Sequence, residues 1–294
     1  MNEIKKAIIP IAGLGTRFLP LSKVVPKELL PLVDVPMIHH IVEEVKHSGI
    51  REVIFICKPE RNKLVLDYFK RTPHLEKILK ERKKENLLRE LKKLDDLFGD
   101  ISFTYVLQRK PLGDGHAVLQ ASNLIHDEPV ACLFADDIIV SKTPALLQLL
   151  KVFKTCQKPV LALYSIARER VSSYGIVGTD KIANRLHKIR KIVEKPQASL
   201  APSNLAIVGK YILTHDVFDY LGKARLKGKK EIILAEVFEK MIGEGKLIYG
   251  YEVQGTWLEC GTKLEWLKSH LYLSLQDSHY GPELKKFLKE TRIL

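Results

Sequence analysis

The sequence opens with an apolar run that enters a glycine turn, Ala7-Ile8-Ile9-Pro10-Ile11-Ala12-Gly13-Leu14-Gly15-Thr16-Arg17-Phe18-Leu19-Pro20. The apolar residues predict a buried strand, and the turn predicts an anion site where that strand ends. Glycine accepts positive φ and lets the backbone approach a ligand, and successive N–H groups in such a turn bind phosphate oxygens. Arg17 adds a planar fork for a phosphate, and Lys27 adds a point charge.

Two common phosphate motifs do not fit this turn. A dinucleotide fingerprint requires a third glycine at the position of Phe18, and a Walker A loop requires a Gly-Lys-Ser/Thr triplet that does not follow Gly13. On the glycines alone, a strand-to-helix corner without a ligand is an equal alternative. Thr16, Arg17 and Lys27 in the same short segment favour a phosphate site.

Asp34 invites comparison with the acidic ribose ligand of dinucleotide-binding proteins. It precedes Pro36 by two residues, and the amphipathic run Met37, Ile38, Ile41, Val42, Val45 begins just after that proline. This pattern predicts a helix over 36–47, which stops near Gly49, with Asp34 as its N-cap rather than as a ligand.

The first half of the chain alternates between strand and helix patterns. Apolar strands are predicted at 53–57, 103–107, 130–134 and 160–166, with helices after the stretch 108–117 and over 143–155. This alternation predicts an α/β fold, a Rossmann-like doubly wound mixed sheet flanked by helices. Such sheets bind ligands at the carboxyl ends of their strands. The glycine turn, Gln108 and Asp136 all follow strands, so we expect one site to collect them.

The second half changes character. Short strands are predicted at 174–177, 188–194, 205–213 and 247–253, with helices near 214–222 and 231–243 and at the C-terminus. No repeat or linker divides the chain, so we expect one domain over 1–294. Its nucleotide-binding half would span about 1–170, and a smaller sugar-binding and C-terminal helical part about 171–294. The basic stretch 223–230 is expected to be a mobile loop.

The net charge of +13 raises the question of a nucleic-acid partner. Part of the charge lies in residues 70–93, where leucines recur at helical spacing. That pattern predicts an amphipathic helix pair with a solvated basic face. Because no aromatic residues interleave with these lysines, a stacking surface for single strands is absent, and we expect no nucleic-acid partner.

Hydropathy and cysteine usage indicate a cytoplasmic protein. No run of eighteen apolar residues predicts a membrane span, and residues 1–6 show no signal-peptide pattern. Of the four cysteines, Cys57 and Cys132 fall within or beside strand-like runs, and none has metal-like spacing. We therefore expect buried free thiols in a reducing compartment.

Two motifs carry a family resemblance: Gly13-Leu14-Gly15-Thr16-Arg17-Phe18-Leu19-Pro20, and Pro26-Lys27-Glu28-Leu29-Leu30-Pro31-Leu32-Val33-Asp34-Val35-Pro36-Met37. Together they resemble the signature of sugar-1-phosphate nucleotidyltransferases. Later motifs follow in family order over nearly the whole chain. The helical insert at 70–93 is more similar to bacterial UTP–glucose-1-phosphate uridylyltransferases than to thymidylyltransferases. The resemblance implies an enzyme that forms UDP-glucose and pyrophosphate from UTP and glucose 1-phosphate with Mg²⁺, as a dimer or tetramer.

The nucleotide side of the site follows from the resemblance. It implies phosphate and base contacts from the loop and from the stretch after the third strand, at Ala12, Gly13, Gly15, Thr16, Gln108, Gly113 and Gly115. Gln108 can both donate and accept, which suits the imide edge of uracil, although an isolated glutamine there is more often a polar loop residue. His116 is expected only to start a helix.

Charge neutralisation is assigned, by the same resemblance, to Arg17, Lys27, Asp136 and Lys195. Asp136 would hold Mg²⁺, although a paired aspartate at a strand end also begins turns. The family's second metal-binding aspartate is replaced here by Glu259, whose side chain is one methylene longer. On the sugar side the resemblance implies contacts in three later segments, at Gly175, Glu194, Asn204, Val208 and Gly209. Without it, Glu194-Lys195 would be read as a solvated strand end.

One segment departs from the family pattern. Where uridylyltransferases carry Gln, Thr and Asp, this chain has Ile233, Ala235 and Glu236. Polar contacts near the rim of the site or at a helix start are therefore altered. Two further readings stay open on this ground, a nucleotidyltransferase for another nucleotide or sugar, such as dTTP, and a weakly active regulatory paralogue that binds nucleotide-sugar.

Overall fold

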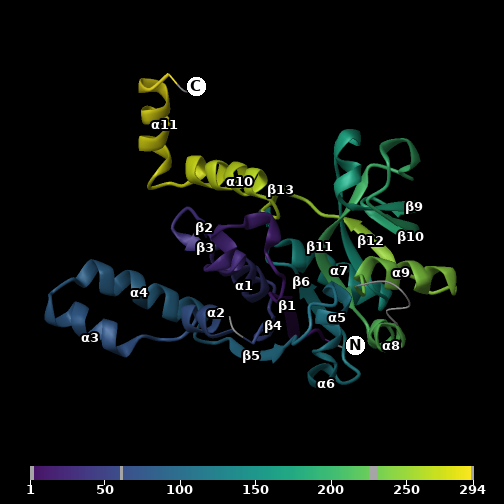
Figure 1. Ribbon diagram of the computed structural model, residues 1–294, viewed down its shortest axis with the longest axis horizontal. Coiled ribbons are helices and arrows are strands. Elements are labelled where there is room, and N and C mark those ends of the chain that lie inside the picture. The colour runs from purple at the N-terminus through teal and green to yellow at the C-terminus, as the bar shows by residue number, and fades with distance from the viewer. Residues whose placement is uncertain (1–2, 60–61, 225–230, 293–294) are drawn as a thin grey trace.

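The computed structural model describes residues 3–59, 62–224 and 231–292. Its centre is a nine-stranded sheet with the strand order β5-β4-β1-β6-β11-β8-β12-β10-β9 (Figure 1). The strands are β1 (Lys6–Pro10), β4 (Glu52–Cys57), β5 (Ser102–Leu107), β6 (Val130–Leu133), β8 (Val160–Ser165), β9 (Gly175–Ala183), β10 (Leu186–Glu194), β11 (Leu205–Leu213) and β12 (Tyr249–Glu252).

The sheet is mixed. Strands β5, β4, β1 and β6 are parallel to one another, and β11 then runs antiparallel to both β6 and β8. Strand β12 is parallel to β8, while β10 and β9 are antiparallel additions at the edge. The predicted doubly wound mixed sheet is therefore confirmed. One sheet holds strands from both predicted halves of the chain, 1–170 and 171–294.

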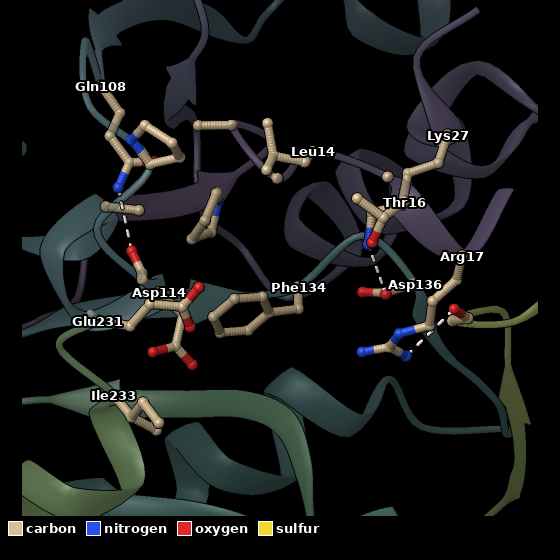
Figure 2. A pocket seen from close by; sticks show the side chains of 18 of the residues that line it. Leu14, Thr16, Arg17, Lys27, Gln108, Asp114, Phe134, Asp136, Glu231 and Ile233 are labelled. Atoms are coloured by element: carbon tan, nitrogen blue, oxygen red, sulfur yellow. Dashed lines mark hydrogen bonds and ion pairs between the residues drawn. The ribbon is translucent and has the colours of Figure 1, made fainter. Parts of the chain in front are cut away.

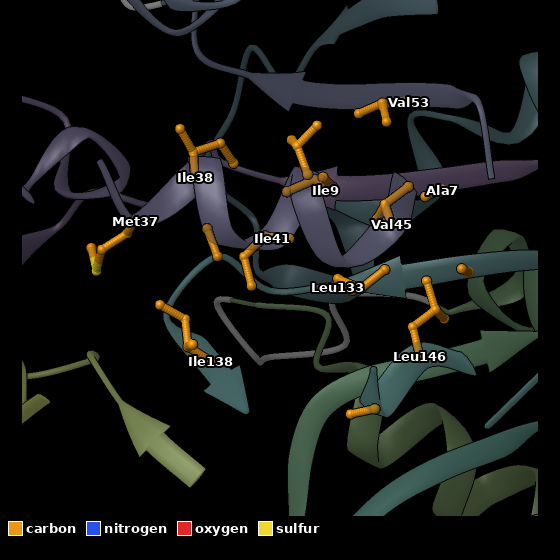
Figure 3. Packing of buried hydrophobic residues seen from close by; sticks show 14 of the residues in the cluster. Ala7, Ile9, Met37, Ile38, Ile41, Val45, Val53, Leu133, Ile138 and Leu146 are labelled. Carbon is orange, nitrogen blue, oxygen red and sulfur yellow. The ribbon is translucent and has the colours of Figure 1, made fainter. Parts of the chain in front are cut away.

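Helices cover both faces of this sheet because the side chains of its central strands alternate between two buried layers. Ala7 and Ile9 of β1 face one cluster with α1 and α7, whereas Ile8 faces the other with α5, α8 and α9. Figure 3 shows the first cluster, with the apolar face of α1 packed on the strands. The helices of these layers are α1 (Met37–His47), α7 (Ala145–Cys156), α5 (Asp114–Leu119), α8 (His215–Lys223) and α9 (Leu234–Gly243).

The prediction that Asp34 caps α1 is wrong. Two-residue strands, β2 (Pro31–Leu32) and β3 (Val35–Pro36), form a tight hairpin, and Asp34 lies in its turn after Val33 at φ 62°. Pro36 is the residue before the helix, and no side chain caps it. A capping aspartate must stand at the boundary itself, and the hairpin uses the residues that separate Asp34 from it.

Two helix pairs extend away from these layers. The predicted basic helix pair is confirmed as α3 (Pro73–Glu81) and α4 (Glu85–Phe98), which extend as an arm from the sheet (Figure 1). Helices α10 (Lys263–Gln276) and α11 (Gly281–Glu290) end the described chain on a second extension. Two short helices, α2 (Asn62–Tyr68) and α6 (Ser122–Ile125), connect strands.

Several short elements complete the fold. A separate strand pair joins β7 (Asp137–Val140) to β13 (Thr256–Glu259), which sets Glu259 opposite Asp137. Short 3₁₀ helices are η1 (Thr16–Phe18), η2 (Leu21–Lys23), η3 (Lys27–Leu29), η4 (Arg168–Ser173) and η5 (Ala198–Leu200). Most of the predicted basic loop, residues 225–230, lies outside the described residues. Cys57 and Cys132 are buried free thiols, as predicted. Within the described ranges, none of the helices is both long and apolar enough to cross a membrane.

Candidate active site

A cavity of about 450 Å³ opens where β1, β5 and β6 end (Figure 2). It adjoins a second cavity of about 240 Å³ that reaches toward β9, β11 and β13. Most of the predicted site residues line the first, namely Ala12, Gly13, Gly15, Thr16, Arg17, Lys27, Gln108, Gly113, Asp136, Glu194 and Lys195. The second adds Gly175, Gly209 and Glu259. The expectation that the glycine turn, Gln108 and Asp136 meet where strands end is therefore confirmed, since all three line the larger cavity.

The glycine turn forms one wall of the larger cavity. Gly15 adopts φ 65°, and its carbonyl accepts hydrogen bonds from Phe18 N at 2.9 Å and Ser22 Oγ at 2.7 Å. Phe18 is 2% exposed, so it anchors the turn in the core. A side chain on Gly13 would meet no atom within 4 Å, which leaves the backbone there open to a ligand. Hydrogen bonds and Phe18 thus fix the turn on its core side, and its cavity side stays open to a ligand.

Lys27 and Asp136 face each other across this wall, as Figure 2 shows. Lys27 Nζ lies 2.6 Å from Asp136 Oδ2, and each side chain is 20% exposed. Burial favours the neutral form of each group, yet the opposite charge outweighs it. The pair therefore raises the pKa of Lys27 and lowers the pKa of Asp136. Both residues are charged near neutral pH. Arg17 is fixed beside them, since its Nη1 donates to Gly261 O at 3.2 Å.

Asp137 is held by bonds on both of its oxygens. Gly209 N donates to Oδ2 at 3.0 Å, and Trp257 Nε1 donates to Oδ1 at 2.7 Å. Burial and the neighbouring Asp136 charge raise the pKa of Asp137 to about 7. A side chain on Gly209 would overlap the Asp137 carboxylate, so glycine permits this close packing. Sequence analysis did not single out Asp137, and only its place beside Asp136 signals it.

Glu28 is a second residue that sequence analysis missed. It lines the cavity beside Lys27 and is 3% exposed, and its Oε1 has no hydrogen-bond partner in the described part of the chain. Burial raises the pKa of Glu28 to about 7 despite the nearby Lys27 charge. A buried carboxyl with an unpaired oxygen is costly, which is typical of groups retained at a ligand site. Its place beside Lys27 in the second family motif is the one signal in the sequence that could have found it.

The base-side residues lie at the other end of the cavity. Gln108 is 5% exposed, and its Nε2 donates to Gly113 O at 3.0 Å (Figure 2). Gly113 lines the cavity at φ 101°, a conformation that favours glycine. Gly115 does not line it. Its N–H donates to Ile232 O and Asp114 Oδ1, and the space beside its Cα is filled by Ile232.

Asp114 explains how the altered segment is tolerated. Ile233 precedes α9 and has no side chain that can cap it, so Asp114 Oδ1 accepts a hydrogen bond from Leu234 N at 2.9 Å instead. Burial raises the pKa of Asp114. Glu231 and Ile233 face the larger cavity, and Ala235 faces the smaller one. Two of the three departures from the family pattern, Ile233 and Ala235, therefore fall on the walls of the site, and Glu236 does not.

The sugar-side residues are only partly brought together. Glu194 and Lys195 line both cavities, and Gly175 packs its open side against Glu194 Oε2. The side chains of Asn204 and Val208 do not line either cavity. Asn204 Nδ2 donates to Ser165 Oγ at 3.0 Å, and Val208 is completely buried in the core cluster on the opposite face of β11. Side-chain alternation along the strand explains the burial of Val208.

Glu259 is anchored through one oxygen and open through the other. Arg170 Nη2 donates to Oε2 at 3.0 Å, and the Tyr174 hydroxyl donates to the same atom. Burial, and then this bond to a carboxylate, raise the pKa of Tyr174 above its usual range. A side chain on Gly261 would meet Arg17 Nη1 at 3.1 Å and both Glu259 Oε1 and Asp136 Oδ2 at 3.4 Å, so two carboxylate oxygens and one guanidinium nitrogen surround this space.

These two carboxylates fit a Mg²⁺ ion. The described residues contain no group of three or more His, Cys, Asp or Glu side chains that could hold a metal. Mg²⁺ commonly binds through only one or two carboxylates plus substrate phosphates and water. Asp136 and Glu259 supply two such oxygens around the space at Gly261, which opens toward both cavities. The donor set therefore suits a metal that is shared with a phosphate ligand.

Comparison with known proteins covers almost the entire chain. Residues 6–274 match the family described as nucleotidyl transferase. The UTP–glucose-1-phosphate uridylyltransferase of Staphylococcus haemolyticus is 39% identical over 290 residues, which is 99% of each chain. UTP–glucose-1-phosphate uridylyltransferase 2 of Staphylococcus saprophyticus is 38% identical over 293 residues, the full length of both.

Solved structures agree with these relatives. A UTP-bound UGPase from Acinetobacter baumannii aligns with TM-score 0.88 and 33% identity, over 98% of this chain and 99% of that one. A UDP-glucose pyrophosphorylase complexed with UDP-glucose aligns with TM-score 0.82 and 33% identity, over 94% of this chain and all of the other. The chain therefore belongs to the nucleotidyl transferase family, within which it groups with the UTP–glucose-1-phosphate uridylyltransferases.

Proposed function

We propose that this protein transfers a uridylyl group from UTP to glucose 1-phosphate and releases pyrophosphate. The observation that carries the proposal is the shared cavity. The open glycine turn with Arg17, the Lys27–Asp136 pair, the base-side Gln108 and the Glu194–Lys195 pair all line it, and relatives of matching length carry this activity in their names.

In the proposed reaction an oxygen of the sugar phosphate attacks the α-phosphorus of UTP in line. The new P–O bond forms as the bond between the α-phosphorus and the bridging oxygen to the β-phosphate breaks, and that electron pair leaves with pyrophosphate. The nucleophile is already an anion, so no base is needed. Catalysis then consists of positioning and charge neutralisation.

Each cation has a place in this scheme that follows from its position. The turn at Gly13–Thr16 and Arg17 would hold the leaving pyrophosphate, and Lys27, charged through its contact with Asp136, would neutralise developing charge beside them. Lys195, which is 57% exposed and reaches both cavities, would receive the sugar phosphate. Removing one such contact typically lowers the rate by about 10²–10³.

Asp136 and Glu259 are the residues that would hold Mg²⁺. When bound, this ion would neutralise phosphate charge and orient the two phosphates.

We further propose the division into a nucleotide-binding half, about 1–170, and a sugar-binding half, about 171–294. A dimer or tetramer is expected, and the exposed leucines of α10 at 264, 267 and 271 support a contact there. Light scattering on the purified protein would measure that state.

The deciding experiment is pyrophosphate release from UTP and glucose 1-phosphate, with and without Mg²⁺, for the wild type and Asp136→Asn. Asp180→Asn is the matched control, because Asp180 is a 56% exposed carboxylate that pairs with Arg190 away from the cavity. We expect release that needs Mg²⁺, persists in the control and falls at least about a hundredfold in Asp136→Asn.

Substrate controls extend this experiment to the two alternatives. Faster release with dTTP, or with another sugar phosphate, would mean that the protein prefers that substrate. The altered segment around Ile233, which lines the cavity, would then account for the changed preference. No release from a folded protein that still binds UDP-glucose would refute the enzymatic proposal and favour a regulatory paralogue.

A further inference from the structure

The geometry points to His116 as a positioning residue that fixes the side-chain amide of Gln108 and so makes the site select uracil over cytosine. His116 lies on α5 and was expected only to start that helix. This inference rests on the proposed function, since it assumes that Gln108 faces the base of a nucleotide in the larger cavity.

The orientation of the Gln108 amide is set by its neighbours. Gly113 O can only accept a hydrogen bond, so the atom 3.0 Å from it must be the amide nitrogen. The same nitrogen lies 3.0 Å from His116 Nδ1. Both hydrogens of the amide are thus directed inward, one to a backbone oxygen and one to the imidazole.

His116 can serve as this acceptor only in one state. Burial lowers the pKa of His116, so the ring is neutral near pH 7 and carries a single N–H. Two amide nitrogens face the ring, Gln108 Nε2 at 3.0 Å from Nδ1 and Gln120 Nε2 at 3.3 Å from Nε2, and a neutral ring accepts from only one of them. Gln108 makes the shorter contact and is 5% exposed, so we assign the acceptor to Nδ1 and the hydrogen to Nε2. Gln120 Nε2 donates to the main-chain oxygen of His116 at 3.1 Å and does not compete for Nδ1.

The remaining polar atom of the amide, Gln108 Oε1, is the one that would contact the base. Gln108 Oε1 accepts no hydrogen bond from the described residues, and it is not among their buried unpaired atoms. It therefore stays accessible at the cavity as a fixed acceptor. Uracil carries a donor at N3, which complements this oxygen, whereas cytosine carries an acceptor at N3, which repels it.

Cytosine could bind well only if the amide turned by 180° and offered its nitrogen. Turning would place Oε1 against two acceptors, Gly113 O and His116 Nδ1, so both interactions resist it. Gly113 O supplies one of these two acceptors, and His116 Nδ1 supplies the other. Removing the imidazole acceptor takes away about half of the restraint, and loss of one such hydrogen bond changes a ratio of affinities by roughly 5- to 30-fold.

The test compares His116→Leu with His116→Asn. Asn Oδ1 can replace Nδ1 as an acceptor, while Leu cannot. For each variant and the wild type, kcat and KM are measured with UTP and with CTP at saturating glucose 1-phosphate. We expect His116→Leu to raise KM for UTP with a small change in kcat, and to lower the UTP-to-CTP preference by roughly 5- to 30-fold. His116→Asn should keep most of that preference.

Two results would overturn the inference. One is an unchanged UTP-to-CTP preference in His116→Leu. The other is an equal loss in both variants together with lower melting temperatures, which would indicate a structural role alone. Calorimetric titration with UTP and with CTP, without sugar, separates this inference from the proposed function. If the wild type turns over neither nucleotide yet binds UTP in preference to CTP, and His116→Leu loses that preference, the enzymatic proposal fails while the role of His116 stands.

Discussion

Replacing Glu28 with Gln is expected to stabilise the protein, and to do so more strongly as the pH rises. Glu28 is 3% exposed and its Oε1 is unpaired among the described residues, so burial raises the pKa of its carboxyl from 4.5 to about 7. Between these two values the folded protein keeps a proton that the unfolded chain has lost. The contribution of Glu28 to the free energy of unfolding of the wild type therefore falls as the pH rises from 4.5 to about 7.

The size of the effect follows from the same two values. Ionising Glu28 at pH 8 costs the folded state about 3 kcal/mol, and at pH 5 less than about 1 kcal/mol. Glu28→Gln removes the ionisation while keeping the shape of the side chain. The variant should gain up to about 3 kcal/mol over the wild type at pH 8, and the gain should shrink to under about 1 kcal/mol at pH 5.

Urea unfolding of both proteins at the two pH values measures this difference. Glu76→Gln is the matched control, because Glu76 is 6% exposed but both of its oxygens accept hydrogen bonds from Arg71. That substitution removes an ion pair and should give no gain. An advantage of Glu28→Gln that stays constant from pH 5 to pH 8, or a loss at pH 8, would refute the reasoning.

Three further substitutions test other contacts. Lys210→Met leaves the Glu44 carboxylate without its partner at 2.6 Å in the core and should cost about 3–5 kcal/mol in urea unfolding, most of which Glu44→Gln in the same chain should restore. A urea midpoint of the Lys210→Met variant equal to that of the wild type would contradict this expectation. Gly209→Ala drives a methyl group into Asp137 and should cost about 1–3 kcal/mol, measured by thermal melting. Tyr174→Phe removes a hydroxyl that anchors one candidate metal carboxylate, so the Mg²⁺ concentration for half-maximal activity should rise roughly tenfold, and an unchanged titration curve would argue against that anchor.

The boundaries of the buried strands in the first half were predictable because their apolar runs are local, whereas β9 continues to Ala183, beyond the predicted 174–177, through half-buried and exposed residues. The pattern Val53–Cys57 needs no distant partner to indicate a buried strand, and the observed β4 spans Glu52–Cys57. The error at Asp34 had the opposite origin. Whether an aspartate caps a helix depends on one residue of register, and a two-residue hairpin shifted that register without any apolar signal.

The candidate site divides in the same way. The candidate phosphate loop, Arg17 and Lys27 stand close together in the sequence at 13–27, so they could be proposed without a structure. By contrast, Glu259 and Arg170 are 89 residues apart, and Asp114 and Leu234 are 120 apart. Contacts of this kind have no periodicity that a single sequence displays.

By itself, the sequence determined the class of fold, the candidate phosphate-binding loop and the family resemblance, because each depends on neighbouring residues. Only the tertiary structure decided which groups are buried without a partner and which carboxylate oxygens stay open. The unpaired Glu28, the anchored Glu259 and the Gln108 amide fixed by His116 all depend on chain segments that folding alone brings together. Burial and hydrogen bonding are properties of that assembly, and they set the charge and direction of each group in the site.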